Sequence, residues 1–133
     1  MKRVDVYFLL LATVLLVCGA ALGIVMGARE DFQLAPVHAH LNLAGWASLA
    51  LFGLVYRAYP MLAARKIAAW HFAISASASI LLPIGIALAL LRAQPTLAIA
   101  ASLLWLLGVL IFLFQLLSLL RADHVPAAVQ PAG

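Results

Sequence analysis

The chain alternates four long apolar runs with short polar breaks. The runs cover approximately residues 6–26, 36–56, 67–91 and 97–120. Each holds about 20 residues or more, the length that a helix needs to cross a hydrocarbon core of about 30 Å. The breaks contain glycine, proline and charged residues, as in GARED at 27–31 and RAYPMLAARK at 57–66. Because links this short make consecutive helices antiparallel neighbours, the pattern predicts an all-α, up-down-up-down four-helix bundle in a membrane.

Composition supports the membrane assignment and excludes other classes. Of 133 residues, 68% are hydrophobic and 9% are charged, whereas soluble domains carry about 25% charged residues. The formal net charge of +4 raises the alternative of a nucleic-acid binder. The basic residues lie near span ends and form no stripe that could follow phosphates, so we expect the lipid bilayer and no nucleic acid as partner. Cys18 is the single cysteine, which excludes a disulfide or a multi-cysteine metal site within one chain.

Basic residues also predict the orientation of the bundle. One side of the membrane would collect Lys2, Arg3, Arg57, Arg65, Lys66 and Arg121, and the other would keep Arg29 and Arg92. Since lysine and arginine accumulate in cytoplasmic loops, both termini are predicted to be cytoplasmic in a bacterial inner membrane. We expect residues 1–121 to form the transmembrane domain. Residues 122–133, rich in proline and alanine, are expected to be a disordered cytoplasmic tail.

The second run opens with polar residues, in the string HAHLNLAGWASLALFGLVYRAYP at 38–60. On one helix His38 and His40 point about 160° apart, so they cannot both face one ligand. The face of His38 also carries a hydrogen-bonding residue and small residues, namely Asn42, Gly45 and Gly53. A flat macrocycle could lie against this stripe because glycine permits close approach. The alternative is that the histidines meet water at the headgroup level and the glycines serve helix packing.

The same string resembles the second transmembrane helix of subunit I of heme–copper oxidases, especially cbb-type cytochrome c oxidases and nitric oxide reductases. In that family a histidine near the outer end of the helix is an axial ligand of low-spin heme b, and a Gly-Trp pair follows it at the spacing of Gly45 and Trp46. The resemblance therefore implies that His38 binds heme b. A second similarity, to heme- and copper-containing membrane proteins of the nitric oxide response, leaves both His38 and His40 open as ligands.

Other parts of that family's pattern are absent. The sequence has no His-His copper pair after a tryptophan, no later helix with paired heme ligands, and fewer spans than subunit I. A complete dioxygen-reducing centre is therefore not expected, and whether the protein is an enzyme stays open. One function is a heme b protein of respiratory electron transfer or of dioxygen or nitric oxide chemistry. The other is a membrane accessory or assembly subunit whose histidines bind copper transiently or bind no metal.

A low-spin heme needs a second axial ligand. In the outer half of the membrane the sequence offers only His38, His40 and Met26. Since the two histidines diverge on their helix, the second ligand is Met26 or a histidine of another chain. The alternative for a monomer is a five-coordinate, high-spin heme. A two-fold axis along the membrane normal would bring two copies of His38 to the same depth. We therefore expect a homo-oligomer or a subunit of a respiratory membrane complex.

A second polar group is predicted at the cytoplasmic side. His71 lies about one turn inside the third run, and Gln115 lies near the end of the fourth run at a similar depth. Polar residues inside membrane spans are costly and usually face a partner. The sequence predicts a hydrogen bond between a neutral His71 and Gln115. The alternative is that His71 is an inner ligand or part of a proton path.

Overall fold

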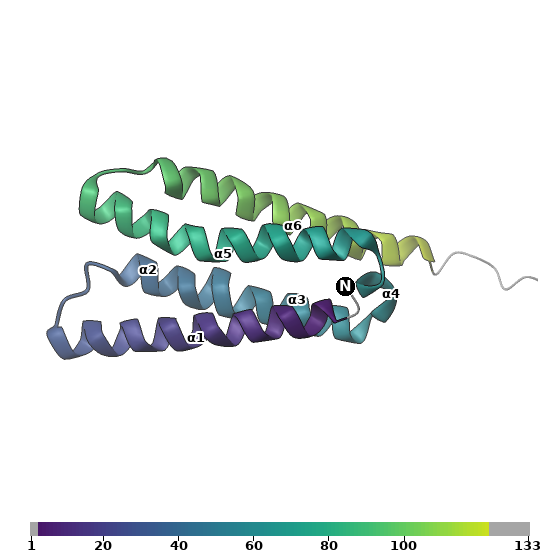
Figure 1. Ribbon diagram of the computed structural model, residues 1–133, viewed down its shortest axis with the longest axis horizontal. Coiled ribbons are helices and arrows are strands. Elements are labelled where there is room, and N and C mark those ends of the chain that lie inside the picture. The colour runs from purple at the N-terminus through teal and green to yellow at the C-terminus, as the bar shows by residue number, and fades with distance from the viewer. Residues whose placement is uncertain (1–2, 123–133) are drawn as a thin grey trace, which may run out of the picture.

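The protein is all-helical over the residues that the structure describes. The computed structural model describes residues 3–122 (Figure 1). Its elements are α1 (Val4–Arg29), α2 (Ala35–His40), the π-helix η1 (Leu41–Ala47), α3 (Ser48–Ala58), α4 (Pro60–Ala63), α5 (Lys66–Arg92) and α6 (Thr96–Ala122). No strand occurs between residues 3 and 122. Beyond Ala122, the predicted tail lies outside the described residues.

Four helical segments are long and apolar enough to cross a membrane. They are α1, the continuous α2–η1–α3 segment (Ala35–Ala58), α5 and the part of α6 up to Leu120. Each contains one of the four runs that the sequence predicts. The predicted all-α membrane bundle is therefore confirmed, and the chain is a multi-pass membrane protein.

Two helical hairpins make up the bundle. Figure 1 shows α1 beside α2 and α3, and α5 beside α6. The α1 helix packs on η1 and α3, while α5 packs closely on α6 and also on α2, which joins the hairpins. We call the end that contains α4 and the start of α1 the α4 end. The opposite end, with the start of α2 and the α5–α6 link, is the α2 end.

Aromatic rings join the hairpins in the half of the bundle nearer the α4 end. Phe8 of α1 lies edge-on to Phe72 of α5, with ring centroids 5.0 Å apart. Phe52 of α3 lies 4.4 Å from Phe112 of α6. Such pairs stabilise a core beyond the area that they bury. Many leucines, isoleucines and valines instead lie exposed on the outer faces of the helices, which suits contact with lipid.

The second span contains a π-helical turn that the hydrophobic pattern does not predict. Within it, Asn42 Nδ2 donates to the His38 carbonyl at 2.9 Å. In a regular α-helix that carbonyl accepts the backbone N–H of Asn42, so the side chain competes with the helix. Ser48 Oγ donates to the Leu43 carbonyl, five residues back, at 2.7 Å. Single π-helical turns frequently occur at functional sites, which draws attention to this segment.

Candidate functional site

His38 turns toward α1 and packs inside the first hairpin. Its Nδ1 lies 2.9 Å from the Gly19 carbonyl oxygen. Because a carbonyl only accepts, Nδ1 carries the proton and Nε2 keeps the lone pair. The ring lies against Gly23, where a Cβ atom would be 2.8 Å from His38 Cε1. The Asn42 amide nitrogen lies 3.4 Å from Nε2 and 3.5 Å from Nδ1.

The rest of the predicted stripe also packs on α1. A Cβ atom at Gly45 would lie 3.0 Å from Leu15 Cδ1. One at Gly53 would lie 2.9 Å from the Asp5 carbonyl oxygen. In this structure α1 therefore occupies the face on which the sequence predicted a macrocycle. The physical reason is that glycines which admit a flat ligand admit a neighbouring helix equally well.

His40 lies on the opposite side of the second span and faces the other hairpin. Its Nδ1 donates to the Pro36 carbonyl at 2.7 Å, which leaves the Nε2 lone pair for another partner. The ring lines a cavity of about 370 Å³. The other lining residues come from α2, η1, α3, α5 and α6: Ala39, Leu43, Ala44, Ser48, Leu82, Ser102 and Trp105. The site is therefore a mainly apolar cavity with one imidazole in its wall.

Two other residues of the predicted heme site lie away from this cavity. Met26 is buried near the end of α1 and lines a separate small cavity at the α2 end. Trp46 is 41% exposed and belongs to neither cavity. Among the described residues, no group of three or more His, Cys, Asp or Glu side chains gathers to hold a metal ion. Neither Met26 nor Trp46 therefore lines the cavity that contains His40.

The second predicted polar group does assemble, but through a third residue. The Tyr56 hydroxyl lies 2.8 Å from His71 Nδ1 and also accepts a hydrogen bond from Gln115 Nε2. All three side chains are fully buried. Since the Tyr56 oxygen accepts from Gln115, its own proton points to His71 Nδ1, and the imidazole proton is on Nε2. The predicted pair is therefore bridged by Tyr56, which the sequence places at a similar inner depth without predicting that its hydroxyl joins the two side chains.

Aromatic rings enclose this cluster, and some of its polar atoms have no hydrogen-bond partner. The His71 ring stacks on Phe112 with centroids 5.5 Å apart and lies 4.8 Å from Phe52. Three buried atoms have no hydrogen-bond partner within the described residues, namely His71 Nε2, Ser75 Oγ and Gln115 Oε1. Leaving such atoms unpaired costs about 1–3 kcal/mol each. Polar groups kept in a membrane span at this cost commonly mark function.

Taken together, the fold and these sites define a four-span helical membrane protein with histidines at two depths. Comparison with known proteins gives no family model, curated protein or solved structure that matches the chain. Evidence on function therefore comes from the geometry of the two histidine sites.

Proposed function

We propose that the protein binds heme b through His40 and takes part in respiratory electron transfer or small-gas chemistry. The observation that carries this proposal is the state of the His40 ring. Its Nδ1–H is held by the Pro36 carbonyl, and metal-ligating histidines almost always donate their other N–H in this way. His38 has the same tautomer, but its ring is partly buried against Gly23 of α1, whereas the His40 ring is more exposed. His40 is thus the better ligand.

The residues beside His40 suit a porphyrin. Leu82 and Trp105 provide apolar walls, and the volume of about 370 Å³ lies within the range of about 300–1,000 Å³ typical of ligand sites. Leu43, which is 67% exposed, forms part of the wall, so the cavity opens on the surface of the bundle. When bound, heme would supply one-electron chemistry or gas binding at the iron. The chain would supply a fixed imidazole and exclude water.

A second residue that would hold the heme would come from another chain. Met26 lines a different cavity, and His38 points to the opposite side of the second span. A two-fold axis along the membrane normal would place two copies of His40 at one depth. The proposal therefore includes a homodimer, or a place in a respiratory complex whose other subunit supplies the ligand.

The orientation of the protein belongs to the same proposal. Of the basic residues, Arg3, Arg57, Arg65 and Lys66 lie at the α4 end, and Arg29 and Arg92 lie at the α2 end. The excess of positive charge favours a cytoplasmic α4 end in a bacterial inner membrane. His40 would then lie in the outer half of the bilayer, where electrons could pass to or from a partner outside.

A second candidate function is an accessory or assembly subunit whose histidines bind copper transiently or no metal. It is favoured by the observation that both His38 and His40 already bond to backbone carbonyls of the bundle. In this reading His38 stabilises the packing of the second span on α1, and His40 bonds within its own helix. Copper, with its preference for imidazole and thioether ligands, would bind at the surface of the α2 end.

The absorption spectrum of the purified protein distinguishes the two functions. The full chain is expressed under heme-sufficient conditions and purified in mild detergent. The heme proposal predicts a Soret band with α and β bands that sharpen on reduction, together with iron in elemental analysis. A colourless protein under these conditions would refute it, and stoichiometric copper without heme would favour the accessory function.

A further inference from the structure

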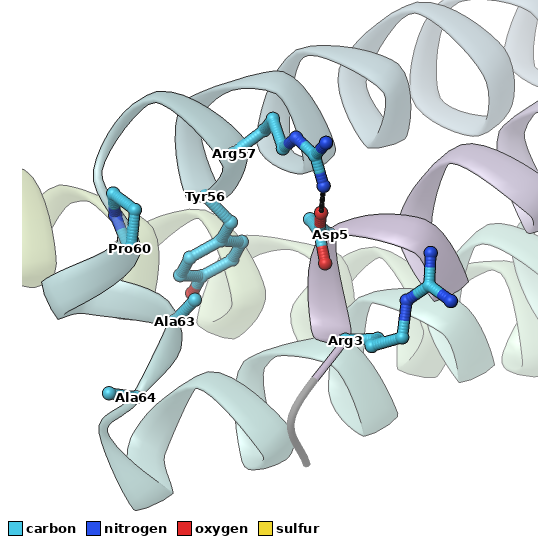
Figure 2. A pocket seen from close by; sticks show the side chains of 7 residues that line it. All are labelled: Arg3, Asp5, Tyr56, Arg57, Pro60, Ala63 and Ala64. Carbon is cyan, nitrogen blue, oxygen red and sulfur yellow. Dashed lines mark hydrogen bonds and ion pairs between the residues drawn. The ribbon is translucent and has the colours of Figure 1, made fainter.

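A second cavity lies at the α4 end, away from the proposed heme site. It has a volume of about 640 Å³ and lies where α1 begins and where α3 passes into α4 (Figure 2). Its lining residues are Arg3, Asp5, Tyr56, Arg57, Pro60, Ala63 and Ala64. Because the first span begins and the second span ends here, the cavity lies at the depth of the lipid headgroups.

One wall of this cavity carries positive charge. Arg57 Nη1 donates to Asp5 Oδ2 at 3.1 Å, and the Arg57 side chain is 72% exposed. Arg3 contributes a second guanidinium, which forms no ion pair within the described residues. No side chain caps the start of α1, so its first N–H groups add the partial positive charge of a helix N-terminus. Two arginines against one aspartate leave this wall with a net charge of +1.

The other wall is largely apolar. Figure 2 shows Arg3 and Arg57 on the side of Asp5, whereas Tyr56, Pro60, Ala63 and Ala64 line the opposite side. A free phosphate ion could match the charged wall but would leave the apolar wall without a partner. An amphiphile at the membrane surface matches both walls.

We propose that this cavity binds the phosphate headgroup of an anionic phospholipid. Arg3 and Arg57 would donate to the phosphate, and the glycerol and upper acyl chains would lie against Pro60 and Ala63. A guanidinium has five donors in a fixed fork, so Arg57 can hold Asp5 and a phosphate together. Basic pockets between membrane helices are known to recognise anionic headgroups. This site does not depend on heme.

Native mass spectrometry of the purified full chain measures this binding directly. The probes are phosphatidylglycerol, phosphatidylcholine and inorganic phosphate. We expect phosphatidylglycerol to bind about tenfold or more tighter than phosphatidylcholine. Arg3→Gln and Arg57→Gln should each weaken the binding of phosphatidylglycerol about fivefold. This is the contribution of one arginine near a membrane surface, expressed as a ratio of affinities. The matched control is Arg92→Gln, which removes the same charge at the α2 end and should leave the affinity unchanged.

Asp5→Asn tests the charge of the wall without removing a donor. It frees Arg57 from its ion pair, so phosphatidylglycerol should bind more tightly, by about threefold to fivefold. Circular dichroism of each variant checks that its helices are intact. Equal affinity for the two lipids, an Arg92→Gln loss as large as that of Arg57→Gln, or an unchanged or weaker Asp5→Asn affinity would overturn the proposal. Inorganic phosphate binding as tightly as phosphatidylglycerol would overturn the lipid assignment.

Discussion

At the scale of single residues, the Tyr56 hydroxyl organises the buried polar cluster. It bonds to α5 through His71 and to α6 through Gln115, so it ties the two hairpins together. The aromatic rings around it exclude water, which makes each hydrogen bond stronger and each unpaired atom more costly. Removal of this hydroxyl is therefore expected to lower the free energy of unfolding.

Tyr56→Phe tests that expectation. The variant keeps the ring and leaves His71 Nδ1 and Gln115 Nε2 without their partner, so the free energy of unfolding should fall by about 1–3 kcal/mol. Equilibrium unfolding in mixed micelles measures the loss. The control is Tyr7→Phe, because Tyr7 is 47% exposed and its hydroxyl forms no hydrogen bond with the other described residues. Equal losses in both variants would contradict the bridging role.

A double-mutant cycle tests whether His71 and Gln115 are energetically coupled through Tyr56. We expect His71→Leu and Gln115→Leu to show a coupling energy of about 0.5–2 kcal/mol in the parent protein, as for other hydrogen bonds between membrane helices. The same cycle built on Tyr56→Phe should be additive, since the shared partner is gone. Coupling that survives in that background would show that the two side chains meet directly.

How far this cluster can be predicted depends on which residue is considered. The depths of His71 and Gln115 follow from counting residues into their spans, so their proximity is predictable. The role of Tyr56 is not, because the direction of its hydroxyl depends on the rotation of α3 against α5. The hydrophobic pattern does not determine that rotation. A tyrosine near the end of a span is also typical of the membrane–water interface.

At the scale of elements, the α5–α6 hairpin relies on one close backbone contact. A Cβ atom at Gly85 would lie 2.5 Å from the Ala98 backbone nitrogen. A backbone atom cannot move out of the way by a change of rotamer, as a side chain can. At Gly27, in contrast, a Cβ atom would meet nothing within 4 Å. The two glycines therefore differ in what they do, although both lie in apolar helices.

Alanine substitution separates these roles. Gly85→Ala should push α6 away from α5 and lower the free energy of unfolding by about 1–3 kcal/mol, the usual cost of overpacking. Gly27→Ala should be neutral or slightly stabilising, because alanine favours a helix over glycine by about 0.5–1 kcal/mol. The unfolding equilibrium in micelles measures both. A stable Gly85→Ala protein would mean that the helices do not approach this closely.

The hydrophobic pattern predicts the four spans and their antiparallel order, because both follow from run length and short links. It does not predict η1, since a π-helical turn buries the same kinds of residue as an α-helical turn. The face shared by His38 and Gly45 is also predictable from helical periodicity. Its partner is not, because small residues accommodate a macrocycle and a helix alike, and the structure places α1 there.

At the scale of the whole molecule, the distribution of charge predicts which end faces the cytoplasm. Ala64 at the α4 end and Gln94 at the α2 end are both exposed. In a Cys18→Ser background, single cysteines at these positions should react oppositely with an impermeant thiol reagent added to intact cells. Gln94→Cys should be labelled and Ala64→Cys protected. Labelling of Ala64→Cys alone would show that the orientation is the opposite of the predicted one. Labelling of both variants would contradict the four-span topology.

His40 is proposed to hold a heme at the cavity between the two hairpins. The most direct test of this proposal is the reduced-minus-oxidised absorption spectrum of His40→Ala beside that of His38→Ala. His40→Ala should lose the low-spin bands, whereas His38→Ala should retain them and lose stability instead, because its ring packs on α1. Loss of the bands in His38→Ala with an unchanged spectrum in His40→Ala would contradict ligation by His40 and place the heme on the face that α1 covers.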